Sequence, residues 1–139
     1  MVMGDGCLML GDGVEYMKKE KGIVDLSFDF AVRIVNLYKF LSQSKQEYVL
    51  SKQLLRSGTS IGANVQEAQA AQTKKDFIAK MSIASKEARE SRYWIDLLVK
   101  TDYLGPKDRH VQTLLAEIES IGKLLTSIVK TSQEKQNVK

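Results

Sequence analysis

Residues 54–68 read LLRSGTSIGANVQEA, and this stretch decides the fold because it places two glycines inside a helical pattern. Its apolar and small residues recur at four- and three-residue steps, the period of a buried helix face. These residues are Leu54, Gly58, Ile61, Val65 and Ala68. Each glycine inside a helix costs roughly 1 kcal/mol relative to alanine, so Gly58 and Gly62 need compensation. Close approach by a neighbouring helix is the simplest source of it.

One later segment offers matching small residues, at Ala84, Ala88 and Ser91. We therefore expect Gly58 and Gly62 to face these residues or an equivalent close neighbour. A Gly58→Leu substitution should overpack the contact and destabilise the protein by at least ~1–3 kcal/mol.

Composition indicates one all-helical domain. The chain has 139 residues, of which 43% are hydrophobic and 27% charged, so it can bury a substantial core. A single proline and the lack of alternating apolar and polar runs argue against a sheet. The lone Cys7 excludes an internal disulfide framework and suits a reducing compartment. No apolar run approaches the ~20 residues of a membrane span, and no signal peptide is recognisable. We expect a cytoplasmic protein that does not bind membranes.

The chain divides into three segments: a flexible leader at residues 1–22, a helical domain at 23–133 and a disordered tail at 134–139. The leader carries four glycines among its first thirteen residues, without periodicity. Met17 is an alternative natural start.

Within the domain, the apolar pattern predicts four helices. The first covers about residues 26–42. The second opens at Ser44–Glu47, a capping-box signature, and runs to about 71. A weaker start signal at Thr73 opens the third, which carries Phe77, Met81, Ala84, Ala88, Ser91, Ile95 and Leu98.

Gly105 and Pro106 separate the third helix from the fourth. Glycine can end a helix in a left-handed turn, and proline can occupy the first position of the next helix. The fourth helix carries Val111, Leu114, Ile118, Ile121, Leu125 and Ile128. Because the connections are short, neighbouring helices should be antiparallel. The sequence therefore predicts an all-α, up-down-up-down four-helix bundle.

The third helix has more apolar residues than one core stripe needs. Ile83, Trp94 and Leu97 lie beside the seam, with Glu87 and Glu90 between them. The first helix is likewise apolar over more than one face. Such a surplus favours burial against another subunit, so we expect a homo-oligomer. In the alternative interpretation, Trp94 simply caps one end of the core.

Residue patterns typical of catalysis or metal binding are missing. The only histidine, His110, has Lys107 three residues before it, so the Glu-x-x-His motif of di-iron bundles is absent. Cys7 lies in the leader. Residues 57–64 resemble a phosphate-binding loop but lack its Gly-Lys-Ser/Thr ending. We expect no enzyme activity, cofactor or metal.

Three glutamates form the remaining catalytic candidate. Glu67, Glu87 and Glu90 could act as paired carboxylates only if they converged in a cleft with separated pKa values. More simply, they bridge helices to Arg56, Arg89 or Arg92 or lie in a subunit interface.

Charge suggests a polyanionic partner. The formal net charge is +4, but residues 33–100 hold twelve Lys/Arg against six Asp/Glu. A solvated helix face is the ordinary explanation. In a pentamer, however, five copies at +4 each would carry +20 and attract RNA or DNA through phosphate contacts. The candidate nucleic-acid-binding residues on the third helix are Lys74, Lys75, Lys80, Lys86, Arg89 and Arg92; Lys100 adds to its charge.

Residues 54–68, 76–80 and 83–88, with Tyr93 and Trp94, resemble the bacterial four helix bundle protein family. It is also called the 23S rRNA-intervening sequence protein family, because members are encoded inside insertions in large-subunit ribosomal RNA genes. The resemblance covers about residues 28–125. It implies an antiparallel bundle that assembles as a homopentameric ring. The family motif implies which residues pack between helices, and it implies no active-site residues.

Related proteins are the accessory variability determinants of diversity-generating retroelements. There, the resemblance implies, a basic barrel binds nucleic acid and docks on a reverse transcriptase. Two function classes follow for this chain. One is a basic oligomer that binds nucleic acid with little sequence specificity, as an accessory factor to a reverse transcriptase or an RNA. The alternative is a non-catalytic protein-interaction scaffold whose basic residues only keep it soluble.

Overall fold

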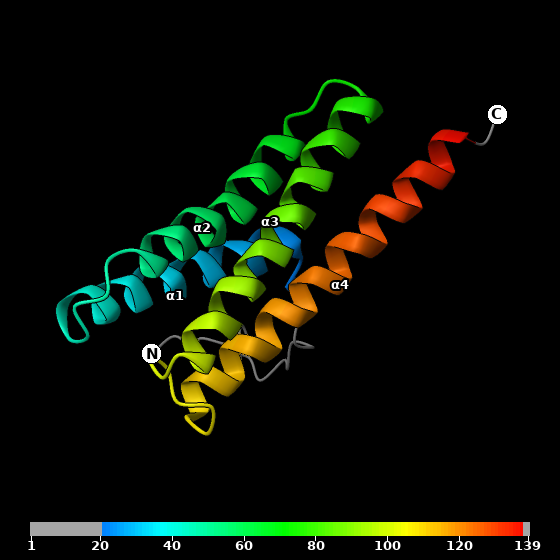
Figure 1. The fold of residues 1–139 in the computed structure, drawn as a ribbon. Helices are drawn as coiled ribbons and strands as arrows, with labels where there is room; N and C mark the ends of the chain where they lie inside the picture. The colour runs from blue at the N-terminus through cyan, green and yellow to red at the C-terminus, as the bar shows by residue number, and fades with distance from the viewer. Residues whose placement is uncertain (1–20, 138–139) are drawn as a thin grey trace, which may run out of the picture.

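A computed structural model describes residues 21–137, which form four α-helices and, over that range, no strand (Figure 1). The helices are α1 (Ile23–Gln43), α2 (Leu50–Gln69), α3 (Lys74–Lys100) and α4 (Arg109–Asn137). The predictions for the leader, including Met17 and Cys7, concern residues that lie almost wholly outside this description. The tail was predicted to be disordered from residue 134, but α4 remains helical to Asn137.

One apolar core joins the four helices, and the predicted stripes supply most of it. All five predicted positions of α2, from Leu54 to Ala68, are buried. The α3 stripe is buried from Met81 to Leu98, while Phe77 is half-buried. In α1, Phe30, Ile34 and Leu41 are buried, and the predicted apolar residues of α4 are buried except for the half-buried Ile128. The predicted helical periods are therefore confirmed.

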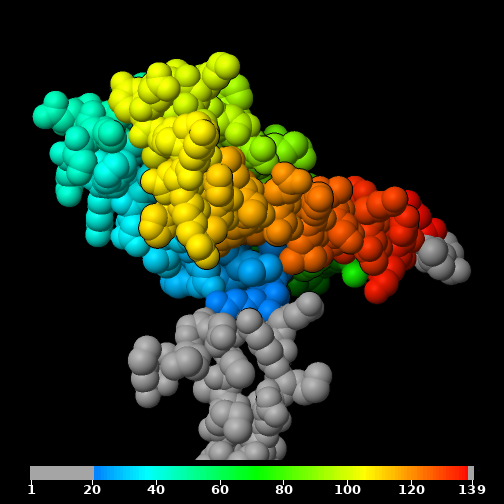
Figure 2. Space-filling view, turned by 90° about the horizontal axis from the view of Figure 1, so that it is seen from below, coloured from blue at the N-terminus to red at the C-terminus, as the bar shows by residue number. Residues whose placement is uncertain are grey.

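Each helix packs against two others, although unequally. α2 packs on α1 and α3, whereas α4 packs mainly on α3 and less on α1. Arg33 of α1 donates hydrogen bonds to Glu117 Oε1 (2.7 Å), the His110 carbonyl (2.9 Å) and Thr113 Oγ1 (3.0 Å), all in the first half of α4. Figure 2 shows the C-terminal part of α4 extending beyond α1. α3 is thus the main neighbour of that part.

The two glycines of α2 do lie at a tight helix–helix contact, but the neighbour is α1 rather than α3. A Cβ atom built on Gly58 would lie 2.8 Å from Ile34 Cγ1 and 2.9 Å from Ile34 Cγ2. One built on Gly62 would lie 3.3 Å from the Ser27 carbonyl oxygen. From Gly58 to Gly62 the partner moves backward along α1, from Ile34 to Ser27.

The small residues of α3 pack on a different side of α2. Ser91 Oγ donates a hydrogen bond to Ser57 Oγ at 3.0 Å, and both side chains are fully buried. Successive residues of an α-helix point about 100° apart, since 3.6 residues make one turn. Ser57 therefore faces α3 while Gly58 faces α1. Ala84, Ala88 and Ser91 are therefore not the glycines' partners, and the equivalent close neighbour that the expectation allowed is α1.

The start of α2 also differs from the prediction. Ser44 does not open α2, because its N–H donates to the Phe40 carbonyl at 2.8 Å and closes α1. Glu47 instead caps the following turn. Its carboxylate accepts hydrogen bonds from the backbone N–H groups of Val49, Leu50 and Ser51, at 3.1, 2.9 and 2.7 Å. α2 consequently begins at Leu50 rather than near residue 45.

The start of α3 is as predicted, and the α3–α4 connection is not. Thr73 Oγ1 accepts a hydrogen bond from the Asp76 N–H at 3.0 Å. After α3, the left-handed residue is Asp102, with φ 71°, rather than Gly105. Leu104 is buried in the core, so α4 starts only at Arg109 and Pro106 lies in the connection.

Candidate nucleic-acid interface

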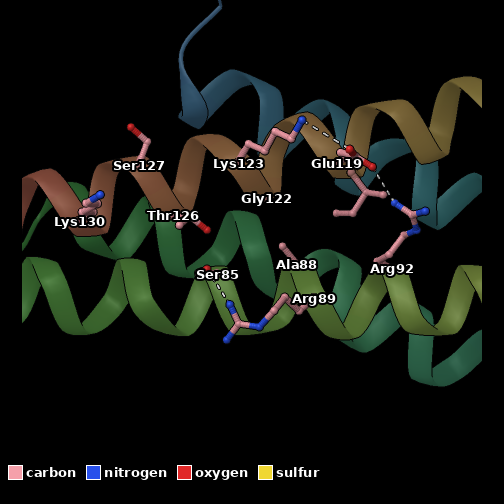
Figure 3. Close-up of a pocket in the computed structure, with 11 residues that line it drawn as sticks. Ser85, Ala88, Arg89, Arg92, Glu119, Gly122, Lys123, Thr126, Ser127 and Lys130 are labelled. Carbon is pink, nitrogen blue, oxygen red and sulfur yellow. Dashed lines mark hydrogen bonds and ion pairs between the residues drawn. The ribbon is translucent and has the colours of Figure 1, made fainter.

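A groove runs between the middle of α3 and residues 118–130 of α4 (Figure 3). It has a volume of about 510 Å³ and continues into an adjoining hollow that reaches Gln133. Small residues leave this space open: Ser85 and Ala88 on α3, and Gly122 on α4. A Cβ atom built on Gly122 would meet nothing within 4 Å. We name this feature, with its adjoining hollow, the α3–α4 groove.

Positive charge predominates along the α3–α4 groove. Its charged lining consists of Lys86, Arg89 and Arg92 from α3, with Glu119, Lys123 and Lys130 from α4. Lys86, Arg89 and Lys130 form no ion pair with any residue of the described range 21–137. Arg89 donates only a hydrogen bond, to Ser85 Oγ at 3.3 Å. These three cations are therefore available to an external anion.

At the end of the groove away from Lys130, an ion-pair cluster connects α3 to α4, as Figure 3 shows. Arg92 Nη1 lies 3.1 Å from Glu119 Oε1, and Lys123 Nζ lies 3.5 Å from Glu119 Oε2. Arg92 also pairs with Asp96 at 3.1 Å. The Arg92 hydrogen bond, followed by the Lys123 charge, lowers the pKa of the Glu119 carboxyl. Two cations thus balance two carboxylates here, and the excess charge lies towards Lys86 and Lys130.

The structure brings together three of the six predicted binding residues, namely Lys86, Arg89 and Arg92. Lys74 and Lys75 are exposed in the first turn of α3, outside the groove. Lys75 lies on the same helix face as Lys86, about three turns away. Lys80 lies on the flank towards α2, where it pairs with Glu67 at 3.0 Å.

Sequence reasoning missed the contribution of α4. Lys123 and Lys130 are seven residues apart and share one helix face, with Thr126 and Ser127 between them. In the sequence, that spacing identifies a polar, basic face of the fourth helix. The sequence does not identify α3 as the helix beside that face, because a helical period gives no information on neighbouring helices.

The three candidate glutamates do not converge on one cleft. Glu87 and Glu90 both pair with Arg56 of α2, Glu87 at 3.3 Å, so they bridge α3 to α2. Trp94 Nε1 donates to Glu90 Oε2 at 2.9 Å. This bond and that of Arg56 lower the pKa of the Glu90 carboxyl. His110 is exposed, and residues 21–137 contain no group of three His, Cys, Asp or Glu that could hold a metal ion.

Apolar side chains are exposed on a different surface. Phe28, Val32 and Val35 recur at four- and three-residue steps on α1 and are 61%, 45% and 37% exposed. We name these three residues the α1 stripe. Trp94 is half-buried and packs against the core, and Ile83, about three turns earlier on α3, is exposed. None of the helices in the described part of the chain has the length and apolarity to cross a membrane.

The family profile described as "23S rRNA-intervening sequence protein" matches residues 19–127. This family match covers most of the residues that line the groove, but not Val129, Lys130 or Gln133. A crystal structure from Bacteroides thetaiotaomicron VPI-5482, described as a protein with unknown function from the S23 ribosomal protein family, is 52% identical with a TM-score of 0.74. The match covers 78% of this chain and 95% of that chain. No functionally curated protein matches the chain.

Proposed function

This chain belongs to the 23S rRNA-intervening sequence protein family, and we propose that it is a non-catalytic, basic homo-oligomer that binds RNA or DNA with little sequence preference. The observation that carries the proposal is the set of cations Lys86, Arg89 and Lys130 in the α3–α4 groove, none of which is ion-paired with a described residue. Lysine and arginine contacts to phosphates position a protein on nucleic acid without reading its sequence.

Self-association is the second part of the proposal. The α1 stripe exposes three apolar side chains on one helix face, and such faces commonly mark protein–protein contacts. The number five, the ring and the up-down-up-down antiparallel arrangement rest on the family resemblance. The backward step from Ile34 to Ser27 along the α1–α2 contact supports antiparallel packing of that pair. A reverse transcriptase is the protein partner that the resemblance implies.

The experiment is a charge reversal on the proposed surface. Lys74, Lys75, Lys86 and Arg89 are all exposed, so their joint replacement by glutamate should leave the fold intact. We expect the variant to bind a structured RNA and an unrelated duplex DNA at least tenfold more weakly in fluorescence anisotropy. Wild-type affinity should fall steeply between low and physiological salt, and the variant should show a shallower slope because it contacts fewer phosphates.

A matched control carries the same change of charge elsewhere. Lys39, Lys45, Lys52 and Lys107 are also exposed and make no ion pair with a described residue. Their reversal should weaken binding much less. Equal losses in both variants would contradict the proposed surface. A correctly assembled wild-type oligomer that binds neither probe at low salt would instead favour the protein-interaction scaffold.

A further inference from the structure

We propose that the α3–α4 groove holds one single strand of nucleic acid by its phosphodiester backbone and leaves the bases outside. The inference rests on the proposed function and adds the strand state and the orientation of the bound strand.

The shape of the site favours a single strand. The groove is a furrow between two helices that pack on each other, and packed helix axes are about 8–10 Å apart. The major groove of a duplex is itself wide enough to admit a whole α-helix. A duplex is therefore too broad to enter the furrow and can only lie across its rim, whereas one sugar–phosphate chain can enter.

The chemistry of the lining determines which part of the strand enters. Ser85, Thr126 and Ser127 present hydroxyl groups, and Arg89 and Lys130 present cations. These side-chain types are typical phosphate ligands. No residue that lines the groove is aromatic, so bases would find no surface on which to stack. Phosphates gain contacts inside the groove, while bases gain none there and remain in solvent.

The ion-pair cluster limits how far the strand extends. Arg92 and Lys123 are already paired with Glu119, and Arg92 also with Asp96, so this end has no excess positive charge to attract a further phosphate. From Gly122 to Lys130, α4 rises about 12 Å, room for about three phosphates. With roughly 0.7 counterions released per phosphate of a single strand, the logarithm of affinity should fall with a slope of about −2 against the logarithm of salt concentration.

A neutral steric block tests the groove separately from charge. Gly122→Leu adds a side chain into open space and changes no charge. Ala116→Leu is the matched control, because Ala116 is an exposed residue of α4 outside the groove. The probes are a 20-nucleotide oligothymidine, an abasic strand of equal length and a duplex of equal length. Circular dichroism and light scattering verify fold and assembly. Should Gly122→Leu change either one, Thr126→Leu fills the same groove from an exposed position without adding an aromatic ring.

The wild type should bind the oligothymidine and abasic strands within about twofold of each other. Gly122→Leu should weaken both at least tenfold and leave duplex binding within about twofold, and Ala116→Leu should change neither. An abasic strand that binds tenfold more weakly would show that the groove holds bases. Gly122→Leu could bind single strands as tightly as the wild type while the charge-reversal variant still loses binding. That result would overturn this inference and leave the proposed function standing. If no probe binds the wild type, the proposed function fails as well.

Discussion

At the scale of single residues, two glycines with the same helical setting have opposite surroundings. Gly58 faces the side chain of Ile34, which is fully buried and, being β-branched, is stiff at χ1. A Cβ atom there would lie under 3.0 Å from two Ile34 carbons. Gly122 lines the α3–α4 groove, and a Cβ atom there would contact nothing. Close packing explains the first glycine, whereas the second keeps a groove open.

We predict that Gly58→Ala destabilises the fold by about 1–3 kcal/mol through overpacking, although alanine favours helix by ~1 kcal/mol. Gly58→Leu should be worse. Gly122→Ala is the matched control and should stabilise by up to ~1 kcal/mol, since only the helix preference acts. Urea unfolding at equal protomer concentration measures both, because association shifts apparent stability. Equal stabilities for the two alanine variants would show that the α1–α2 contact is not tight.

At the scale of helices, the carboxylate of Glu47 determines where α2 begins. Burial by itself raises the pKa of this group, but hydrogen bonds from the N–H groups of Leu50, Ser51 and Val49 together lower it below its ordinary value of 4.5. The fold therefore binds the ionised carboxylate in preference to the protonated acid. Stability from this cap is fully present above pH 4.5, and it is lost as the pH falls through the lowered pKa.

We predict that Glu47→Gln destabilises the protein by about 1–2 kcal/mol at pH 7, because the ionised cap is lost. The difference from wild type should shrink as the pH falls below 4.5, where the wild-type carboxylate itself becomes protonated. Urea unfolding at pH 7, 5 and 3.5 measures it. Glu134→Gln is the control, because Glu134 is exposed on α4 and makes no ion pair with a described residue. A deficit for Glu47→Gln that is constant with pH would contradict the role of its charge.

The same helices show what periodicity can and cannot predict. The buried face of α3, from Met81 to Leu98, follows from one helix repeat and was predictable. Helix ends were not, because they depend on tertiary burial: Leu104 enters the core before α4 starts, so Pro106 remains in the connection. Only the α3 side of the α3–α4 groove was predictable from the sequence. The basic residues of α3 stand out in sequence, but their apposition to Lys123 and Lys130 depends on how α4 lies across the bundle.

At the scale of the whole molecule, the apolar and basic surfaces lie on different helices. The α1 stripe lies on one helix, whereas the α3–α4 groove is built from two others. The flank of α1 that carries Arg33 is engaged with α4, whereas within residues 21–137 the stripe side chains remain exposed. Assembly through α1 would leave the groove of each copy open and would multiply the charge that attracts a polyanion.

We predict that light scattering at micromolar concentration gives a mass several times 15.6 kDa, about 78 kDa for five copies.

Val32→Glu places a charge in the middle of the α1 stripe, where burial against another subunit would leave that charge without water. The mass should fall towards that of one chain. Ser120→Glu introduces the same charge at an exposed position of α4, outside both the α1 stripe and the α3–α4 groove, and should keep the assembly. Nucleic-acid affinity should fall along with the mass in Val32→Glu, because a protomer at +4 attracts a polyanion far less than an assembly at +20. A wild-type protein that is monomeric under these conditions would remove both the self-association and the charge accumulation that depends on it.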